Sequence, residues 1–268
     1  MYNDLFSIGP VTFHTYGLMT AIGIVAAYLM MEHRAREKNF TKEETDKTLG
    51  LILFCLIFGY LGSKILYLLT ILPQLIADPS LFVRSLTGGW VIFGGLLGGI
   101  FGAWLFCHIQ KLPAGKYFDL AFPAVALAQA FGRVGCFFAG CCYGVETDSA
   151  FSIVFRNSDY APNDVHLVPT QLISAAFDLL LCLFLLWYEK HLQKQSGELA
   201  AIYLIFYSAG RFIVEFWRGD LARGQVGPLS TSQFIGLFTL AAGIILFIII
   251  RKKKPFGAVS GGTANEKA

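Results

Sequence analysis

The stretch LGLILFCLIFGYLGSKILYLLTIL, residues 49–72, decides the fold class of this chain. Its only charged side chain is Lys64, and about 20 apolar residues are enough for a helix to cross the hydrocarbon of a bilayer. Six further apolar runs have the same character and are separated by polar or Pro-containing segments; they span residues 16–31, 90–108, 118–140, 171–188, 199–217 and 233–250. We therefore predict an all-α integral membrane protein with seven transmembrane helices.

The composition excludes a soluble globular protein. Of the 268 residues, 55% are hydrophobic and 15% are charged, and the mean hydropathy is +0.59. Soluble domains carry roughly 25% charged residues. The net charge of +3 and the short basic run at 251–254 give no basis for nucleic-acid binding. Residues 1–15 contain no Lys or Arg, which argues against a secretory signal peptide.

The distribution of basic residues predicts the orientation. The loops after the first, third and fifth runs, together with the tail, carry 14 Lys and Arg residues, whereas the opposite side carries four. Because basic loops remain in the cytoplasm, we expect the N-terminus outside and the C-terminus inside. Residues 1–250 are expected to form one membrane domain, and residues 251–268 a tail that is first basic and then disordered.

Three cations lie inside the apolar runs: Lys64, Arg133 and Arg211. Placing such a charged side chain near the bilayer centre costs about 3 kcal/mol or more of free energy. Each cation therefore needs a partner or a water-filled cavity. Glu215 follows Arg211 by one helical turn, and a purely structural ion pair is as good an interpretation of these two as a functional one. Arg133 has no acid within reach on its own helix and needs Asp178 or Glu215 from across the bundle, or an anion. We favour an anionic phospholipid headgroup, because a planar guanidinium meets two phosphate oxygens at once.

Other polar side chains lie near these cations or near the outer membrane edge. Tyr207 precedes Arg211 by four residues, so its hydroxyl is expected to face the same cavity. Tyr16 stands at the end of the first run, where interfacial anchoring is the default role of a tyrosine. His14 lies at the outer edge and can titrate near neutral pH, although a single interfacial histidine is more often incidental than catalytic.

The third run is rich in glycine. Gly94, Gly98 and Gly102 recur every four residues and predict a groove that accepts a neighbouring helix or a lipid chain. The stretch is not a phosphate-binding loop, because it lacks the Walker lysine and a strand context.

Three cysteines fall within seven residues of the stretch GRVGCFFAGCCYG, residues 132–144. Cys136, Cys141 and Cys142 are expected near the outer face, where a disulfide can form. The neighbouring Arg133 also favours a thiolate of lowered pKa, and small buried residues at a helix end are the plain alternative. We do not expect zinc, because the spacing is unusual and no nearby histidine completes a site. The remaining cysteines, Cys55, Cys107 and Cys182, are interpreted as core residues.

Several motifs, taken in order, make the chain from about residue 6 to residue 250 resemble prolipoprotein diacylglyceryl transferase, a bacterial membrane enzyme of lipoprotein maturation. The motifs are FSIGP at 6–10, HTYGLM at 14–19, GSKI at 62–65, PQ at 73–74 with ADP at 77–79, the Gly-Gly-rich third run, GRVG at 132–135, PTQL at 169–172 and YSAGRFIVEFWR at 207–218. Lys64 stands where that family usually has Arg.

The resemblance implies transfer of the diacylglyceryl group of phosphatidylglycerol to the thiol of a lipobox cysteine in a prolipoprotein, with release of glycerol phosphate. It also implies a multi-pass protein of the bacterial plasma membrane, with no cofactor and no metal; the oligomeric state stays open. The family's functional positions correspond here to Tyr16, Arg133, Gly144, Tyr207, Arg211 and Glu215. We predict a phospholipid site made of Arg133, Arg211, Lys64, Gly94, Gly95, Gly98 and Gly144.

The chain departs from the family pattern at groups that handle protons. Phe93 replaces the histidine of the family motif H-G-G, and Phe cannot exchange a proton. Cys136 replaces an asparagine, Ala139 a second asparagine and Cys141 a glutamate. If transferase activity is kept, His14 or a thiolate of Cys136 or Cys141 is expected to replace the missing base.

Two alternatives follow from these departures. The first is a divergent enzyme that uses Cys136, Cys141 and Cys142 for thiol–disulfide exchange or for covalent transfer of a lipid group. The second is a phospholipid-binding protein without turnover.

Overall fold

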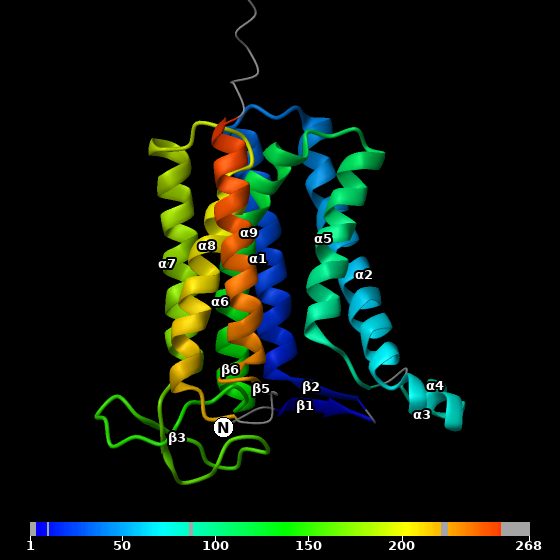
Figure 1. The fold of residues 1–268 in the computed structure, drawn as a ribbon, viewed down its shortest axis with the longest axis vertical. Coiled ribbons are helices and arrows are strands. Elements are labelled where there is room, and N and C mark those ends of the chain that lie inside the picture. Colours follow the sequence, from blue (N-terminus) through cyan, green and yellow to red (C-terminus); the bar gives the residue numbers. More distant parts are fainter. Residues whose placement is uncertain (1–3, 10, 86–87, 221–224, 253–268) are drawn as a thin grey trace, which may run out of the picture.

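A bundle of long, roughly parallel helices makes up most of the molecule (Figure 1). The computed structural model describes residues 4–9, 11–85, 88–220 and 225–252. The long helices are α1 (Thr15–Glu37), α2 (Lys42–Thr70), α5 (Ile92–Ile109), α6 (Ala114–Ala139), α7 (Thr170–His191), α8 (Glu198–Val214) and α9 (Thr231–Lys252).

Short elements fill the connections between the long helices. They are the helices α3 (Leu72–Ala77) and α4 (Leu81–Ser85), the 3₁₀ turn η1 (Glu215–Trp217), and three antiparallel pairs, β1 (Asp4–Ile8) with β2 (Val11–His14), β3 (Ile153–Val154) with β4 (His166–Leu167), and β5 (Gln225–Val226) with β6 (Leu229–Ser230). All of them lie at the end of the bundle opposite the C-terminal end of α9 (Figure 1).

Each predicted apolar run coincides with one long helix, and the predicted integral membrane protein built of helices is confirmed. Six of these helices are long and apolar enough to cross a bilayer, and α5 is a shorter apolar helix. The observed helices extend several residues into polar sequence, because local signals set their ends: α2 begins at a capping box in which Thr41 Oγ1 accepts from the Glu44 amide at 3.2 Å. Arg251 and Lys252, predicted to open the tail, continue α9, and the rest of the predicted tail, residues 253–268 with its predicted disorder from residue 255, falls outside the described residues.

The glycines of α5 serve close packing against α2. A Cβ atom built on Gly98 would lie 2.1 Å from the carbonyl oxygen of Phe58, and one on Gly94 would lie 2.2 Å from that of Gly62. Of the two predicted occupants of this groove, the structure contains the neighbouring helix. The space beside Gly94 and Gly98 is therefore taken by α2, which leaves no room there for a lipid chain. Gly95 makes ordinary contact with α2, because its Cβ would lie 3.5 Å from the Gly59 oxygen.

This packing predicts that alanine substitutions at two adjacent glycines have very different effects on the free energy of unfolding. Gly98→Ala forces the backbones of α2 and α5 apart and is expected to lower the free energy of unfolding by about 1–3 kcal/mol. Gly99→Ala is the matched control, because its Cβ would meet its nearest neighbour, the Cys55 oxygen, at 3.6 Å. Thermal unfolding of both variants in detergent measures the difference, and equal stabilities would contradict the packing described.

A buried polar network closes the end of the bundle where α1, α7 and α9 end. Arg34, which lies in the predicted first loop, is 5% exposed. Its guanidinium donates to the Leu120 oxygen at 2.7 Å and pairs with Glu189 at 2.6 Å. Asp119 of α6 caps α8, because its carboxylate accepts from the amides of Gly197 at 2.7 Å and Leu199 at 3.1 Å.

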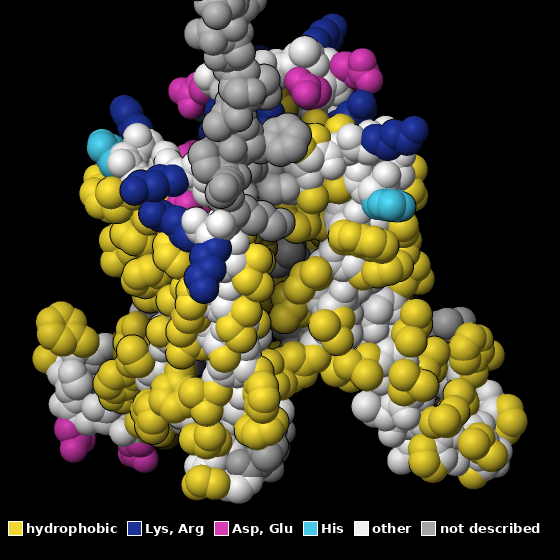
Figure 2. All heavy atoms as spheres, turned by 45° about the horizontal axis from the view of Figure 1, so that its top comes forward, with side chains coloured by type: hydrophobic (Ala, Val, Ile, Leu, Met, Phe, Trp, Pro, Cys, Tyr) yellow, Lys and Arg dark blue, Asp and Glu magenta, His cyan; other side chains and the backbone are white. Residues whose placement is uncertain are grey.

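The α2–α5 pair forms an arm that diverges from the other helices toward the end with α3 and α4 (Figure 1). Figure 2 shows a hollow bordered by hydrophobic side chains between this arm and the rest of the molecule. In the same view, Lys and Arg side chains gather at the end of the molecule where α9 ends, opposite α3 and α4.

Candidate active site

Arg133 of α6 and Arg211 of α8 line one small pocket between α6, α7 and α8. Its lining consists of Arg133, Ser174, Phe177, Asp178, Tyr207, Gly210, Arg211 and Val214. The two arginines predicted to share a ligand thus line one pocket, and Tyr207, whose hydroxyl is predicted to face the cavity of Arg211, is also among the lining residues. The free space is about 10 Å³, which is near the minimum for one water molecule, so a headgroup must displace side chains to enter.

The two guanidiniums differ in their partners. Arg211 Nη1 lies 2.5 Å from Glu215 Oε2, and its Nη2 donates to Ser232 of α9 at 3.3 Å. The predicted ion pair is therefore present, and it holds the Arg211 side chain in place. Arg133 makes no hydrogen bond and no ion pair within 4.0 Å to any residue that the structure describes. Its electrostatic neighbours include Tyr207 and Asp178.

Asp178 is a pocket residue that the sequence interpretation treated only as a partner for Arg133. Its side chain is 2% exposed and faces both arginines, but it forms an ion pair with neither. The Oδ2 atom has no hydrogen-bond partner among the described residues. The signal for this residue was an acid in the middle of an otherwise apolar run, which costs several kcal/mol unless a cation or a cavity lies nearby.

The segment after α6 is fastened to the start of α7. Gln171 Nε2 donates to the Cys141 oxygen at 2.8 Å, and Thr170 Oγ1 donates to the Cys142 oxygen at 2.8 Å. Both donors belong to the PTQL motif and are almost fully buried. This motif therefore acts by fixing the position of the cysteine pair beside the pocket.

Gly144 serves a close backbone contact. Its amide donates to the Val168 oxygen at 3.1 Å, and a Cβ atom would lie 2.4 Å from that oxygen and 2.8 Å from the Trp217 oxygen. The requirement for glycine here is thus explained by packing. Direct contact of Gly144 with a phospholipid is not needed to explain it.

Arg218 is a second residue that the sequence interpretation did not select as a site. Its Nε and Nη2 donate to the two carboxylate oxygens of Asp220 at 2.9 and 2.7 Å, and its side chain is 5% exposed. Burial disfavours the charged form, but the bonds to Asp220 outweigh it and raise the pKa of Arg218 above its ordinary value. Cys142 and Glu215 are among its electrostatic neighbours, so this cation lies beside the cysteine cluster.

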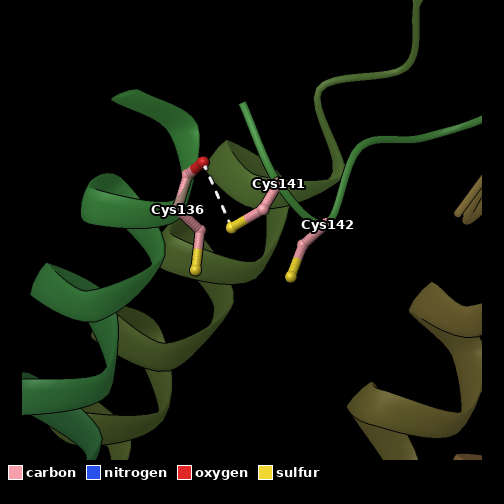
Figure 3. A group of neighbouring side chains, drawn as sticks. All are labelled: Cys136, Cys141 and Cys142. Atoms are coloured by element: carbon pink, nitrogen blue, oxygen red, sulfur yellow. Dashed lines mark hydrogen bonds between the residues drawn. The ribbon is translucent and has the colours of Figure 1, made fainter. Parts of the chain in front are cut away.

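The three cysteines meet at the end of α6 (Figure 3). The sulfur atoms of Cys136, Cys141 and Cys142 lie within 4.8 Å of one another, and all three residues are thiols rather than disulfides. Contacts with the other two thiols, together with partial burial, raise the pKa of Cys141 above its ordinary value. A lowered pKa, as the sequence suggested, is therefore wrong for Cys141.

Tyr16 and His14 occupy the start of α1. A Cβ on Gly135 would lie 3.2 Å from the Tyr16 ring, which places Tyr16 against α6 beside Cys136, and 45% of the tyrosine remains exposed. His14 Nδ1 lies 2.7 Å from Asp4 Oδ1 across the β1–β2 hairpin. The imidazole is half exposed and does not line the arginine pocket.

Lys64 lies in a different part of the molecule. Its ammonium donates to the carbonyl oxygens of Ser85 at 2.6 Å, Gly88 at 2.8 Å and Gly89 at 3.1 Å, and it stacks on the Trp90 ring at 4.4 Å. An ammonium has three N–H donors, so all of them are used. Lys64 therefore needs no phospholipid as a partner, and its contacts fix the segment before α5.

Comparison with known proteins places these residues in a family context. The sequence pattern described as prolipoprotein diacylglyceryl transferase matches residues 3–249. A protein of Clostridium tetani named phosphatidylglycerol–prolipoprotein diacylglyceryl transferase is 42% identical over 250 residues, which cover 93% of this chain and 98% of the relative.

Two further relatives agree. The second enzyme of this name from Clostridium perfringens is 44% identical over 90% of this chain and 92% of its own length. The enzyme of the same name from Dehalococcoides mccartyi is 32% identical over 93% of this chain and 94% of its own. The chain therefore belongs to the prolipoprotein diacylglyceryl transferase family.

Proposed function

We propose that this protein transfers the diacylglyceryl group of phosphatidylglycerol to the thiol of a lipobox cysteine in a prolipoprotein. The sulfur forms a bond to the glyceryl carbon, the bond from that carbon to the phosphate oxygen breaks, the thiol proton passes to a base, and glycerol phosphate leaves. The relatives support this reaction through their names, and one observation in the pocket supports it independently. That observation is the guanidinium of Arg133, which has no ion-pair partner among the described residues and lines the same pocket as Arg211.

The arginines supply the electrostatic part of the reaction. As the carbon–oxygen bond breaks, negative charge accumulates on the departing phosphate, and cations fixed in a site of low dielectric stabilise that charge more than they stabilise the bound lipid. Arg211 is positioned for this task by Glu215, whereas Arg133 makes no hydrogen bond or ion pair with the described residues, which leaves its donors for the phosphate. Tyr207 adds a hydroxyl on the same wall of the pocket.

A base must take the proton of the acceptor thiol, and Phe93 cannot. Of the residues predicted for this role, His14 has an orienting partner, because Asp4 contacts its Nδ1 and leaves Nε2 to accept, but it does not line the arginine pocket. The raised pKa of Cys141 keeps that thiol protonated, which disfavours it as a base. Tyr16 of α1 and Cys136 of α6 are electrostatic neighbours, and both would border the acceptor.

We propose that all seven long helices cross the plasma membrane of a bacterium and form one domain through residue 250. The α5 helix, with 18 residues, is about 27 Å long, close to the roughly 30 Å of the hydrocarbon core. With the basic end of Figure 2 in the cytoplasm, the N-terminus and the cysteine cluster lie toward the outside. The hollow beside the α2–α5 arm would then open to the lipid phase and admit the phospholipid.

Mass spectrometry of reaction products tests the proposal. The purified full-length protein in detergent is mixed with phosphatidylglycerol and a synthetic lipobox peptide, and the peptide should gain one diacylglyceryl group while glycerol phosphate is released. A peptide with Ser in place of the lipobox cysteine is the control and should stay unmodified. Tight retention of phosphatidylglycerol with no modified peptide would instead support a lipid-binding protein without turnover.

A further inference from the structure

The proposed reaction requires at most one thiol of this protein, yet three converge. The sulfurs of Cys136, Cys141 and Cys142 lie within 4.8 Å of one another, and Figure 3 shows the Cys141 sulfur between the other two. A disulfide would need only two of them. Mutual proximity of three sulfurs is what a single cation at their centre requires, and thiolates select soft metal ions.

The backbone conformation after α6 by itself places the three thiols next to one another. Gly140 ends α6 with φ +73°, and Cys142 has φ +61°, a conformation that a side-chain-bearing residue adopts only where its surroundings enforce it. The enforcing contacts are the bonds from Gln171 to the Cys141 oxygen and from Thr170 to the Cys142 oxygen. Two buried side chains anchor the turn. The fold therefore orders the three cysteines before any metal binds.

The surrounding charges favour an anionic metal–thiolate group. Arg133 has Cys136 and Cys142 among its electrostatic neighbours, and Arg218 has Cys142. Three thiolates and a monovalent cation together carry a net charge of −2. Two nearby guanidiniums offset that charge, which would otherwise be costly in a partly buried position.

We propose that Cys136, Cys141 and Cys142 form a three-coordinate site for one soft monovalent cation, Cu(I). On binding, three S–H bonds are replaced by three Cu–S bonds, three protons are released, and the copper keeps its oxidation state. Structural zinc is disfavoured because it takes four ligands, and among the described residues the group contains only these three. The cysteine site borders the proposed transferase site, because Arg133 is an electrostatic neighbour of Cys136 and Cys142, but the binding of Cu(I) does not require the transferase activity.

Competition for Cu(I) tests the site directly. The reduced full-length protein in detergent is titrated without oxygen against a chromogenic Cu(I) chelator, and it should take up one equivalent. Cys136→Ser, Cys141→Ser and Cys142→Ser should each weaken binding by about 100-fold or more, since even residues that only support a ligand are worth 10- to 100-fold. The control is Cys182→Ser, which removes a buried thiol of α7 far along the chain and should leave the affinity unchanged.

X-ray absorption of the copper-loaded wild type keeps the test independent of the variants' folding. Three sulfur scatterers around copper would support the site. The proposal is overturned if the reduced wild type takes up no Cu(I), if uptake persists in the triple serine variant, or if Zn²⁺ binds four-coordinate and Cu(I) cannot displace it. Failure of the peptide assay above would leave all of these results unaffected, because none of them measures lipid transfer.

Discussion

Arg133→Gln should lower kcat/KM for diacylglyceryl transfer by about 100- to 1,000-fold, the effect of removing one preorganised donor to a developing anion. The reason is that Arg133 lines the pocket without an ion-pair partner among the described residues, so its charge is available to the phosphate. Arg133→Lys should recover only part of the loss, because an ammonium keeps the charge but lacks the planar fork. Product formation from phosphatidylglycerol and a lipobox peptide measures the effect.

The matched control for this prediction is Arg156→Gln. Arg156 is 81% exposed in its side chain and lies 3.8 Å from Asp164 on the surface. Activity should therefore stay near that of the wild type. If Arg133→Gln and Arg156→Gln were equally active, the assignment of the phosphate to the arginine pocket would be wrong.

Glu198→Ala should destabilise the protein by about 3 kcal/mol or more, although it lies at the opposite end of the bundle. The Glu198 side chain is fully buried, and Arg251 Nε lies 2.8 Å from it. It also accepts from the Tyr188 hydroxyl at 3.0 Å and from the amide of Gln195 at 3.0 Å. Removing the buried carboxylate leaves the Tyr188 hydroxyl and two partly buried donors without this acceptor, and each unsatisfied buried donor costs about 1–3 kcal/mol.

Thermal unfolding in detergent measures this loss, and Glu37→Ala serves as its control. Glu37 also forms an ion pair, with His33 at 3.3 Å, but both side chains are largely exposed. Such a pair contributes little because water screens it, so the unfolding temperature should barely move. A similar shift for both variants would show that the buried network is not what stabilises this end.

The candidate site was predictable in part, and particular residues show where prediction stopped. Arg133 and Arg211 stood out because cations in apolar runs are costly. Their shared pocket, however, depends on how α6 packs against α8. Along the chain the two residues are separated by the whole of α7. Lys64 looked equivalent to them by the same rule, but three carbonyl groups from the segment before α5 satisfy it. A rule based on hydropathy identifies a residue that needs a partner, and it does not say which partner is present.

The amino-acid sequence by itself determined the class of protein, the position of each long helix and the family motifs, because the hydrophobic length needed to cross a bilayer and the local capping signals are written along the chain. Only the tertiary structure decided which polar groups meet. Asp178 enters the arginine pocket, α2 fills the glycine groove of α5, and three thiols gather beside Arg133. These outcomes depend on contacts between residues distant along the chain, whose geometry follows from the packing of whole helices.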